Sequence, residues 1–157
     1  MASAGVVLRR AMLVRSAKCA CRALCDNASA SVEEFVRDMN RAVAVLELAD
    51  TRFVNPCGWD AEGQYSTARD LLKLARLAME YPEIRTAVAR REFLLESTDR
   101  RHSRLLPNTN LLLGNLDGAR GVKTGFTARA GKCLIALAER GGHQVLSLIH
   151  ISEPTRP

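Results

Sequence analysis

The sequence has few aromatic side chains and no acidic residue before Asp26. Seven aromatics are scattered through 157 residues, whereas proteins that bind nucleic acid place base-reading or stacking groups on a basic face. The net charge is +6, but five of the six excess positive charges lie in the first 25 residues, so the remaining body is nearly neutral. Composition therefore argues against a nucleic-acid-binding function.

Long apolar runs and metal-binding motifs are also absent. No stretch is long enough to span a bilayer, and no signal peptide is visible. The five cysteines make an odd number, and three of them fall within residues 19–25. Neither they nor the three histidines have the spacing of a metal site, so we expect buried or free thiols and no metal.

The helical spacing of apolar residues predicts helices over 6–14, about 20–25, 31–46, 67–78 and 82–89. Ser31 with Glu34 forms a capping box, and Thr67 with Asp70 has the same spacing. The apolar residues after Ser31 predict one buried face, so we expect that helix to be core scaffold. Ser16 lies near the junction of the first two helices, where a Ser is most often a cap.

Helical periodicity disappears between residues 50 and 65. The run 55–60 contains the Pro and Gly that are typical of a constrained loop. A long ordered loop is a candidate wall of a binding site, and it is equally consistent with a simple connection. The residues alone leave both interpretations open.

The second half of the chain favours β-structure. Strands are predicted over 91–95, 104–106, 121–127, 133–139 and from 143 onward. A turn is expected at 97–99, and a capped turn closed by Gly is expected over 108–114. The continuous apolar run 134–138 predicts an inner strand covered on both faces.

The segment 121–127, with the sequence GVKTGFT, combines a cation, a hydroxyl and two glycines on a predicted strand. Gly121 and Gly125 keep side chains out of the way, so an extended substrate could lie alongside the strand. Lys123 and Thr124 would then offer an ammonium and a hydroxyl to an anionic group such as a carboxylate. K-T-G is one of three motifs, with S-x-x-K and an S-x-N element, of penicillin-binding proteins and serine β-lactamases.

Four blocks of the sequence belong together by their order and spacing: 12–17, 51–56 with Gly58 and Asp60, 63–70, and 121–127. Over about residues 12–145 they resemble the serine D-alanyl-D-alanine carboxypeptidases, the low-molecular-mass penicillin-binding proteins of the bacterial cell wall. Together the blocks are far more specific than any one of them. The segment 108–110, with the sequence NTN, adds to the match.

The resemblance implies an α/β sandwich of the α+β class, with an antiparallel sheet flanked by helices as in DD-peptidases and serine β-lactamases, here as a partial domain. Ser16 matches the Ser of the S-x-N element, which takes part in proton transfer. Lys123 and Thr124, with Gly125, match the residues that hold the substrate's terminal carboxylate. The implied reaction removes the terminal D-Ala from peptidoglycan stem peptides through an acyl-enzyme, without a metal or organic cofactor.

The implied partners are stem peptides that end in D-Ala-D-Ala, and β-lactams. The family also implies a periplasmic or extracytoplasmic location, and membrane association of the full-length protein is left open. Two alternatives remain beside the carboxypeptidase. One is a serine β-lactamase-like hydrolase, and the other is a noncatalytic peptidoglycan-binding relative.

Three features depart from the family's pattern. None of the four lysines has a Ser three residues before it, so the S-x-x-K nucleophile is missing and is expected upstream of Met1. Lys18 replaces the Asn of S-x-N, which adds a like charge to a site that already holds Lys123 and removes an acceptor. Cys57 and Trp59 stand where the family usually has His and Leu.

Both ends of the chain are expected to be unusual. We predict a partial peptidase domain over 1–145 that lacks its N-terminal part. Residues 146–157 resemble a translated sequencing adapter and are predicted to be a non-native tail. The acid-free, arginine-rich start is also typical of a mitochondrial transit peptide, but family-like sequence begins almost at once, so we favour a start at an internal Met.

Overall fold

The computed structural model describes residues 3–97, 99 and 101–151. Five helices and five strands occur in this part of the chain. The helices are α1 (Ala4–Arg15), α2 (Lys18–Ala28), α3 (Val32–Val45), α4 (Ala68–Ala78) and α5 (Pro82–Val88). The strands are β1 (Glu92–Glu96), β2 (Ser103–Pro107), β3 (Ala119–Thr127), β4 (Gly131–Arg140) and β5 (His143–Ile151).

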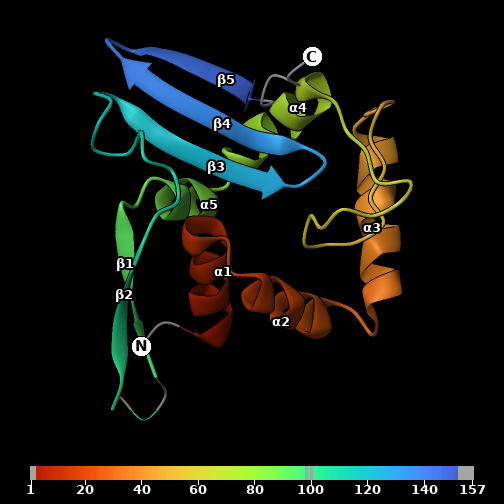
Figure 1. Ribbon diagram of the computed structural model, residues 1–157, viewed down its shortest axis with the longest axis horizontal. Coiled ribbons are helices and arrows are strands. Elements are labelled where there is room, and N and C mark those ends of the chain that lie inside the picture. The colour runs from red at the N-terminus through yellow and green to blue at the C-terminus, as the bar shows by residue number, and fades with distance from the viewer. Residues whose placement is uncertain (1–2, 98, 100, 152–157) are drawn as a thin grey trace.

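The three-stranded antiparallel sheet β3-β4-β5 is the largest β element, and α4 and α5 pack against it (Figure 1). Helix α1 packs on α5 and on the separate hairpin β1-β2, while α2 continues from α1 toward α3 (Figure 1). An antiparallel sheet flanked by helices is the predicted α+β architecture, so the fold prediction is confirmed.

Helix α1 lies between two apolar clusters. Val14 is completely buried with Phe93 in the cluster that joins α1, α2 and the hairpin. Leu13, the residue before it in the same helix, packs against the cluster that joins α5 to the sheet through Val88 and Val122. Full burial of one such side chain stabilises a fold by about 1.5–3 kcal/mol. The end of α1 is thus fixed from both sides, directly before Ser16.

Both predicted helix caps are present. The Ser31 hydroxyl accepts a hydrogen bond from the Glu34 backbone N–H at 3.1 Å, and a Glu34 carboxylate oxygen accepts one from the Ala30 N–H at 3.2 Å. The Thr67 hydroxyl accepts from the Asp70 N–H at 3.3 Å. These bonds satisfy N–H groups that have no partner within their own helix.

Two burial predictions hold in part. The predicted face of α3 is the covered side of that helix, since Val43 is buried, five of the other six apolar residues are half-buried and only Ala42 is exposed. Strand β4 is the central strand, as predicted, and in its apolar run 134–138 Leu137 is buried and the other four residues are half-buried. Residues 131–134 line a cavity, so that end of β4 is not completely covered.

The predicted tail begins inside the sheet. Leu146 lies in β5 and pairs with Leu137 of β4, and the pairing continues to Ile151. An apolar segment can complete a sheet edge whatever its origin, so the prediction of a non-native tail stays a prediction. Residues 152–157 lie outside the described residues.

No helix in the described ranges has both the length and the apolar character needed to cross a bilayer.

The two glycines of the GVKTGFT segment have different surroundings. A Cβ at Gly121, where φ is +131°, would lie 2.8 Å from the Val88 side chain of α5. A Cβ at Gly125 would have Cys133 as its nearest neighbour, at an ordinary 3.9 Å. Gly121 therefore permits contact with α5, and only Gly125 leaves open space beside the strand.

We expect Gly121→Ala to lower the free energy of unfolding by about 2–4 kcal/mol, because it combines overpacking with an unfavourable positive φ. The matched control Gly125→Ala should change it by about 0.5 kcal/mol or less. Urea unfolding of the two variants measures the difference. Equal stabilities would contradict the packing role of Gly121.

Candidate active site

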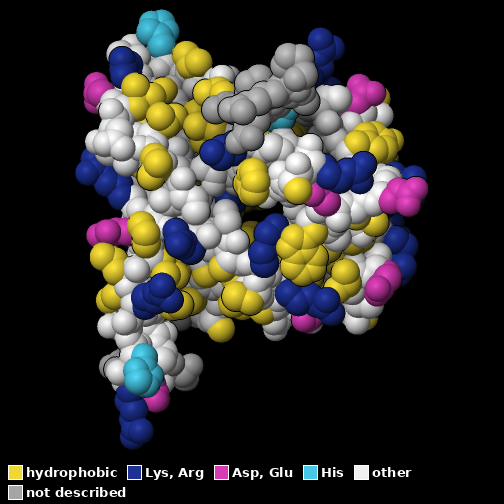
Figure 2. All heavy atoms as spheres, in the orientation of Figure 1, with side chains coloured by type: hydrophobic (Ala, Val, Ile, Leu, Met, Phe, Trp, Pro, Cys, Tyr) yellow, Lys and Arg dark blue, Asp and Glu magenta, His cyan; other side chains and the backbone are white. Residues whose placement is uncertain are grey.

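The four predicted site residues line one cavity of about 1020 Å³ between the sheet and the α1–α2 junction. Ser16 comes from that junction, and Lys123, Thr124 and Gly125 come from β3. Figure 2 shows a hollow near the middle of one face, with Lys and Arg side chains beside it. Residues 107 positions apart in the sequence therefore meet at one site.

Ser16 has an unusual backbone conformation. It ends α1 with φ 58° and ψ 35°, in the left-handed region that residues other than Gly adopt uncommonly. Its backbone N–H donates to the Ala11 carbonyl, which closes the helix end. Ser16 is thus the C-cap residue of α1 through its backbone, and its hydroxyl lines the cavity instead of capping α2, whose N-cap residue is Ala17.

The Lys123 ammonium reaches from β3 to the Ser16 hydroxyl, to which it donates a hydrogen bond. It also donates to the Thr124 backbone carbonyl at 2.8 Å. Burial, and to a smaller extent the positive charge of Lys18, together lower the pKa of Lys123 to about 8. The side chain is therefore mostly protonated at neutral pH but within reach of deprotonation.

Thr109 is a functional-site neighbour that sequence reasoning missed. Its hydroxyl lies 2.6 Å from the Thr124 hydroxyl, and its backbone N–H donates to the Val14 carbonyl at 3.1 Å. Thr109 therefore connects the end of α1 to β3 directly beside Lys123. The signal for it in the sequence is the segment 108–110, which predicts a capped turn and adds to the family match but does not single out Thr109.

The two asparagines beside Thr109 are buried. Asn108 donates to the Arg90 carbonyl at 2.8 Å, and its side-chain oxygen accepts from the Asn110 N–H at 2.8 Å. Among the described residues, the Asn110 side-chain NH₂ is a buried donor without a hydrogen-bond partner. Leaving this donor unpaired costs free energy of folding. The other hydrogen bonds of the turn, made by Asn108, have to offset that cost.

The cavity lining is cationic. Lys18, Lys123 and Lys132 line it, and no Asp or Glu is among its lining residues. Within the described ranges, no three His, Cys, Asp or Glu side chains are grouped so that they could hold a metal ion. A carboxylate entering the cavity would meet ammonium groups without a competing acidic side chain.

The 50–65 loop forms part of the cavity wall. Pro56, Cys57 and Gly58 line the cavity, which supports the site-wall interpretation over a simple connection. Asp70 of α4 anchors the loop, because its carboxylate accepts hydrogen bonds from the Thr51 hydroxyl at 2.8 Å and from the Asp50 N–H at 3.1 Å.

One cysteine prediction is wrong. Cys21 and Cys57 form a disulfide between α2 and this loop, with Cα atoms 5.9 Å apart. Cys19, Cys25 and Cys133 are free, as expected for thiols. No local pattern pairs two cysteines 36 positions apart, because their proximity depends on how the loop folds back onto α2.

Comparison with known proteins agrees with the geometry. The family model described as D-alanyl-D-alanine carboxypeptidase, Peptidase S11, matches residues 6–151. The chain therefore belongs to the D-alanyl-D-alanine carboxypeptidase family. It is 38% identical over 128 residues to the carboxypeptidase DacF of Bacillus subtilis, covering 81% of this chain and 32% of the relative. It is 36% identical over 144 residues to the carboxypeptidase DacC of Escherichia coli, covering 90% of this chain and 34% of that relative.

A solved structure gives the same fold. The crystal structure of the Streptomyces K15 DD-transpeptidase matches with a TM-score of 0.88 and 32% identity, over 92% of this chain and 59% of that chain. The chain spans about a third of the length of the curated relatives DacF and DacC.

The surroundings of Lys123 predict its titration. NMR of the four lysine side chains, labelled with ¹³C, should show Lys123 titrating near pH 8 rather than near its ordinary value of 10.5. Lys18→Gln should raise the pKa of Lys123, because it removes a nearby positive charge. The control Lys73→Gln, on α4 and outside the cavity lining, should leave it unchanged. An unshifted Lys123 in the parent chain would contradict the burial of this ammonium.

Proposed function

We propose that this chain supplies the carboxylate-binding wall and the Ser16–Lys123 pair of a serine D-alanyl-D-alanine carboxypeptidase. The observation that carries the proposal is the hydrogen bond between Lys123 and Ser16 in a cavity lined by three lysines and no acidic residue. The substrate class is a peptidoglycan stem peptide that ends in D-Ala-D-Ala, and β-lactams would occupy the same site.

The terminal carboxylate of the peptide binds beside β3. It accepts hydrogen bonds from the Lys123 ammonium and the Thr124 hydroxyl, which both line the cavity. The open space at Gly125 lets the extended peptide approach the strand. The affinity for the carboxylate falls as the pH rises through about 8, because Lys123 loses its charge there.

Catalysis proceeds by acyl transfer. A nucleophilic serine, which is not provided by an S-x-x-K motif within these 157 residues, attacks the carbonyl carbon of the penultimate D-Ala. The peptide C–N bond breaks, and the leaving D-Ala takes up a proton. Water then hydrolyses the acyl-enzyme and releases the trimmed peptide. Ser16, in contact with Lys123, is placed to relay a proton between the nucleophile region and the leaving amine.

An extracytoplasmic location fits this substrate. Peptidoglycan lies outside the cytoplasm, and the Cys21–Cys57 disulfide is of a kind that persists in oxidising compartments.

A noncatalytic peptidoglycan-binding relative is the second candidate, and Lys18 favours it. Lys18 takes the place of the S-x-N amide, but its ammonium donates to the Cys57 carbonyl at 2.5 Å and extends toward the loop. An ammonium has no acceptor, so Lys18 cannot replace an amide oxygen beside Ser16. Binding without turnover by an intact gene product would support this candidate over the enzyme.

The missing S-x-x-K motif gives a direct prediction. The 157-residue polypeptide should form no covalent adduct with a fluorescent penicillin, because the acylated serine is absent. Denaturing electrophoresis after incubation tests this, with a family member that contains S-x-x-K as the positive control. A labelled band from this chain would mean that another of its residues is acylated.

Peptide binding tests the proposed function itself. We expect the chain to bind a peptide ending in D-Ala-D-Ala and to discriminate against the same peptide with a C-terminal amide. Lys123→Ala should weaken binding by about 10- to 150-fold, the value of a hydrogen bond to a charged group. Thr124→Ala should cause a smaller loss, because it removes a neutral donor.

Lys132→Ala is the matched control, since Lys132 lines the cavity from β4 but does not contact Ser16. It should retain most of the affinity in isothermal titration calorimetry, while thermal midpoints confirm that each variant is folded. A folded Lys123→Ala chain that binds as tightly as the parent would remove the basis of the proposal.

A further inference from the structure

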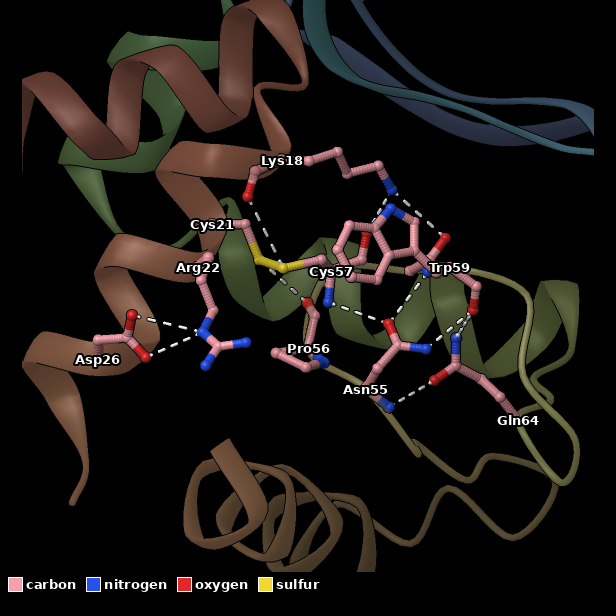
Figure 3. Close-up of a disulfide and its surroundings, with 10 residues drawn as sticks. Lys18, Cys21, Arg22, Asp26, Asn55, Pro56, Cys57, Trp59 and Gln64 are labelled. Carbon is pink, nitrogen blue, oxygen red and sulfur yellow. Dashed lines mark hydrogen bonds and ion pairs between the residues drawn. A yellow bond between two sulfur atoms is a disulfide. The ribbon is translucent and has the colours of Figure 1, made fainter. Parts of the chain in front are cut away.

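The Cys21–Cys57 disulfide joins the first turn of α2 to the loop that forms one wall of the cavity (Figure 3). Both cysteines line the cavity, and Cys21 is buried. The cross-link is therefore part of the cavity wall, although neither cysteine belongs to a motif of the proposed reaction.

The loop on the other side of the disulfide is braced internally. The Asn55 side-chain oxygen accepts from the backbone N–H groups of Cys57 at 3.2 Å and Trp59 at 3.0 Å. The Gln64 side chain donates to the Trp59 carbonyl at 2.8 Å and accepts from the Asn55 N–H at 2.9 Å. A loop braced in this way behaves as one unit, so the cross-link at Cys57 fixes its cavity side against α2, while Asp70 anchors its start to α4.

Lys18 spans the same junction from the α2 side. Its ammonium donates to the carbonyls of Cys57 at 2.5 Å and Gly58 at 3.5 Å, and lies 5.9 Å from the centre of the Trp59 ring (Figure 3). Lys18 is exposed and stands at a helix N-terminus, where a cation is unfavourable. These contacts are individually weak, whereas the disulfide is covalent.

We propose that the Cys21–Cys57 disulfide is a redox-dependent positioning cross-link, which docks the braced loop on α2 and thereby fixes the Lys18 ammonium at the cavity wall. The bond forms by thiol–disulfide exchange with a disulfide-containing oxidant. The Cys21 and Cys57 thiols give up two electrons and two protons, an S–S bond forms between them, and the oxidant leaves as two thiols. A dithiol reductant reverses the reaction.

Reduction releases the loop without unfolding it. The bonds of Asn55 and Gln64 do not involve sulfur, so the loop keeps its internal structure. It loses its covalent attachment to α2, and Lys18 then lacks partners at fixed positions. The ligand consequence rests on the proposed function: a reduced chain should bind a D-Ala-D-Ala peptide about 3- to 10-fold more weakly, because the wall has to be ordered on binding.

Thiol counting tests whether the bond forms. Iodoacetamide should modify three of the five cysteines in the denatured, unreduced chain and all five after treatment with dithiothreitol. Peptide mapping should place the two protected thiols at Cys21 and Cys57. Five reactive thiols in the chain purified under oxidising conditions would overturn the proposal.

Trp59 reports the docking of the loop, because it is the chain's only tryptophan. Its fluorescence anisotropy should fall on reduction, and Cys21→Ser should give the low value without a reductant. The control Cys19→Ser removes an exposed free thiol two positions away and should keep the oxidised value. Equal anisotropy in the oxidised, reduced and Cys21→Ser forms would overturn the positioning role.

Two further measurements complete the test. Far-ultraviolet circular dichroism of the wild-type chain should be unchanged by reduction, and loss of the helical signal would overturn the proposal of local release. Calorimetry with the D-Ala-D-Ala peptide should show the weaker affinity of the reduced form, and equal affinities would overturn the ligand consequence. Failure of both forms to bind would count against the proposed function, while the Trp59 and thiol results would still decide the cross-link.

Discussion

The hydrogen bond between the Lys123 ammonium and the Ser16 hydroxyl is the contact on which the cavity depends. It joins the end of α1 to β3 across the hollow, and the Thr109–Thr124 pair joins the same two elements beside it. Both links are polar and partly buried, so they are directional in a way that apolar packing is not. Apolar clusters on either side of α1 hold the helix in place, but these bonds set the position of its last residue relative to the strand.

This arrangement leaves a cation in a poorly hydrated place without a described acidic partner. Burial alone disfavours a charged Lys123, and Lys18 adds repulsion from the same side. The Ser16 hydroxyl and one carbonyl provide only partial compensation. An incoming carboxylate would relieve both effects, so the free energy lost in forming the empty site would be recovered when an anion binds.

Local sequence signals predict the positions of the helices and strands well, and they predict less well how far each one is buried by its neighbours. The caps at Ser31 and Thr67 depend on residues three positions apart, which a sequence displays directly. The incomplete burial of the α3 face and of the first residues of β4 depends on which elements lie next to them, and periodicity does not record that. The same distinction holds at the site. Lys123 and Thr124 were identified through a contiguous motif, whereas Thr109 and the Cys21–Cys57 bond arise from contacts between distant segments.

The depressed pKa of Lys123 also has a consequence for its chemistry as an amine. Only the neutral amine is nucleophilic, and at neutral pH a lysine with a pKa of about 8 has roughly 300-fold more of that form than one with the ordinary value of 10.5. Lys123 also lines an open cavity, where a small molecule can reach its side chain. An acylating reagent small enough to enter would therefore encounter a reactive amine, so the residue proposed to hold a carboxylate in its charged form is a nucleophile in its neutral form.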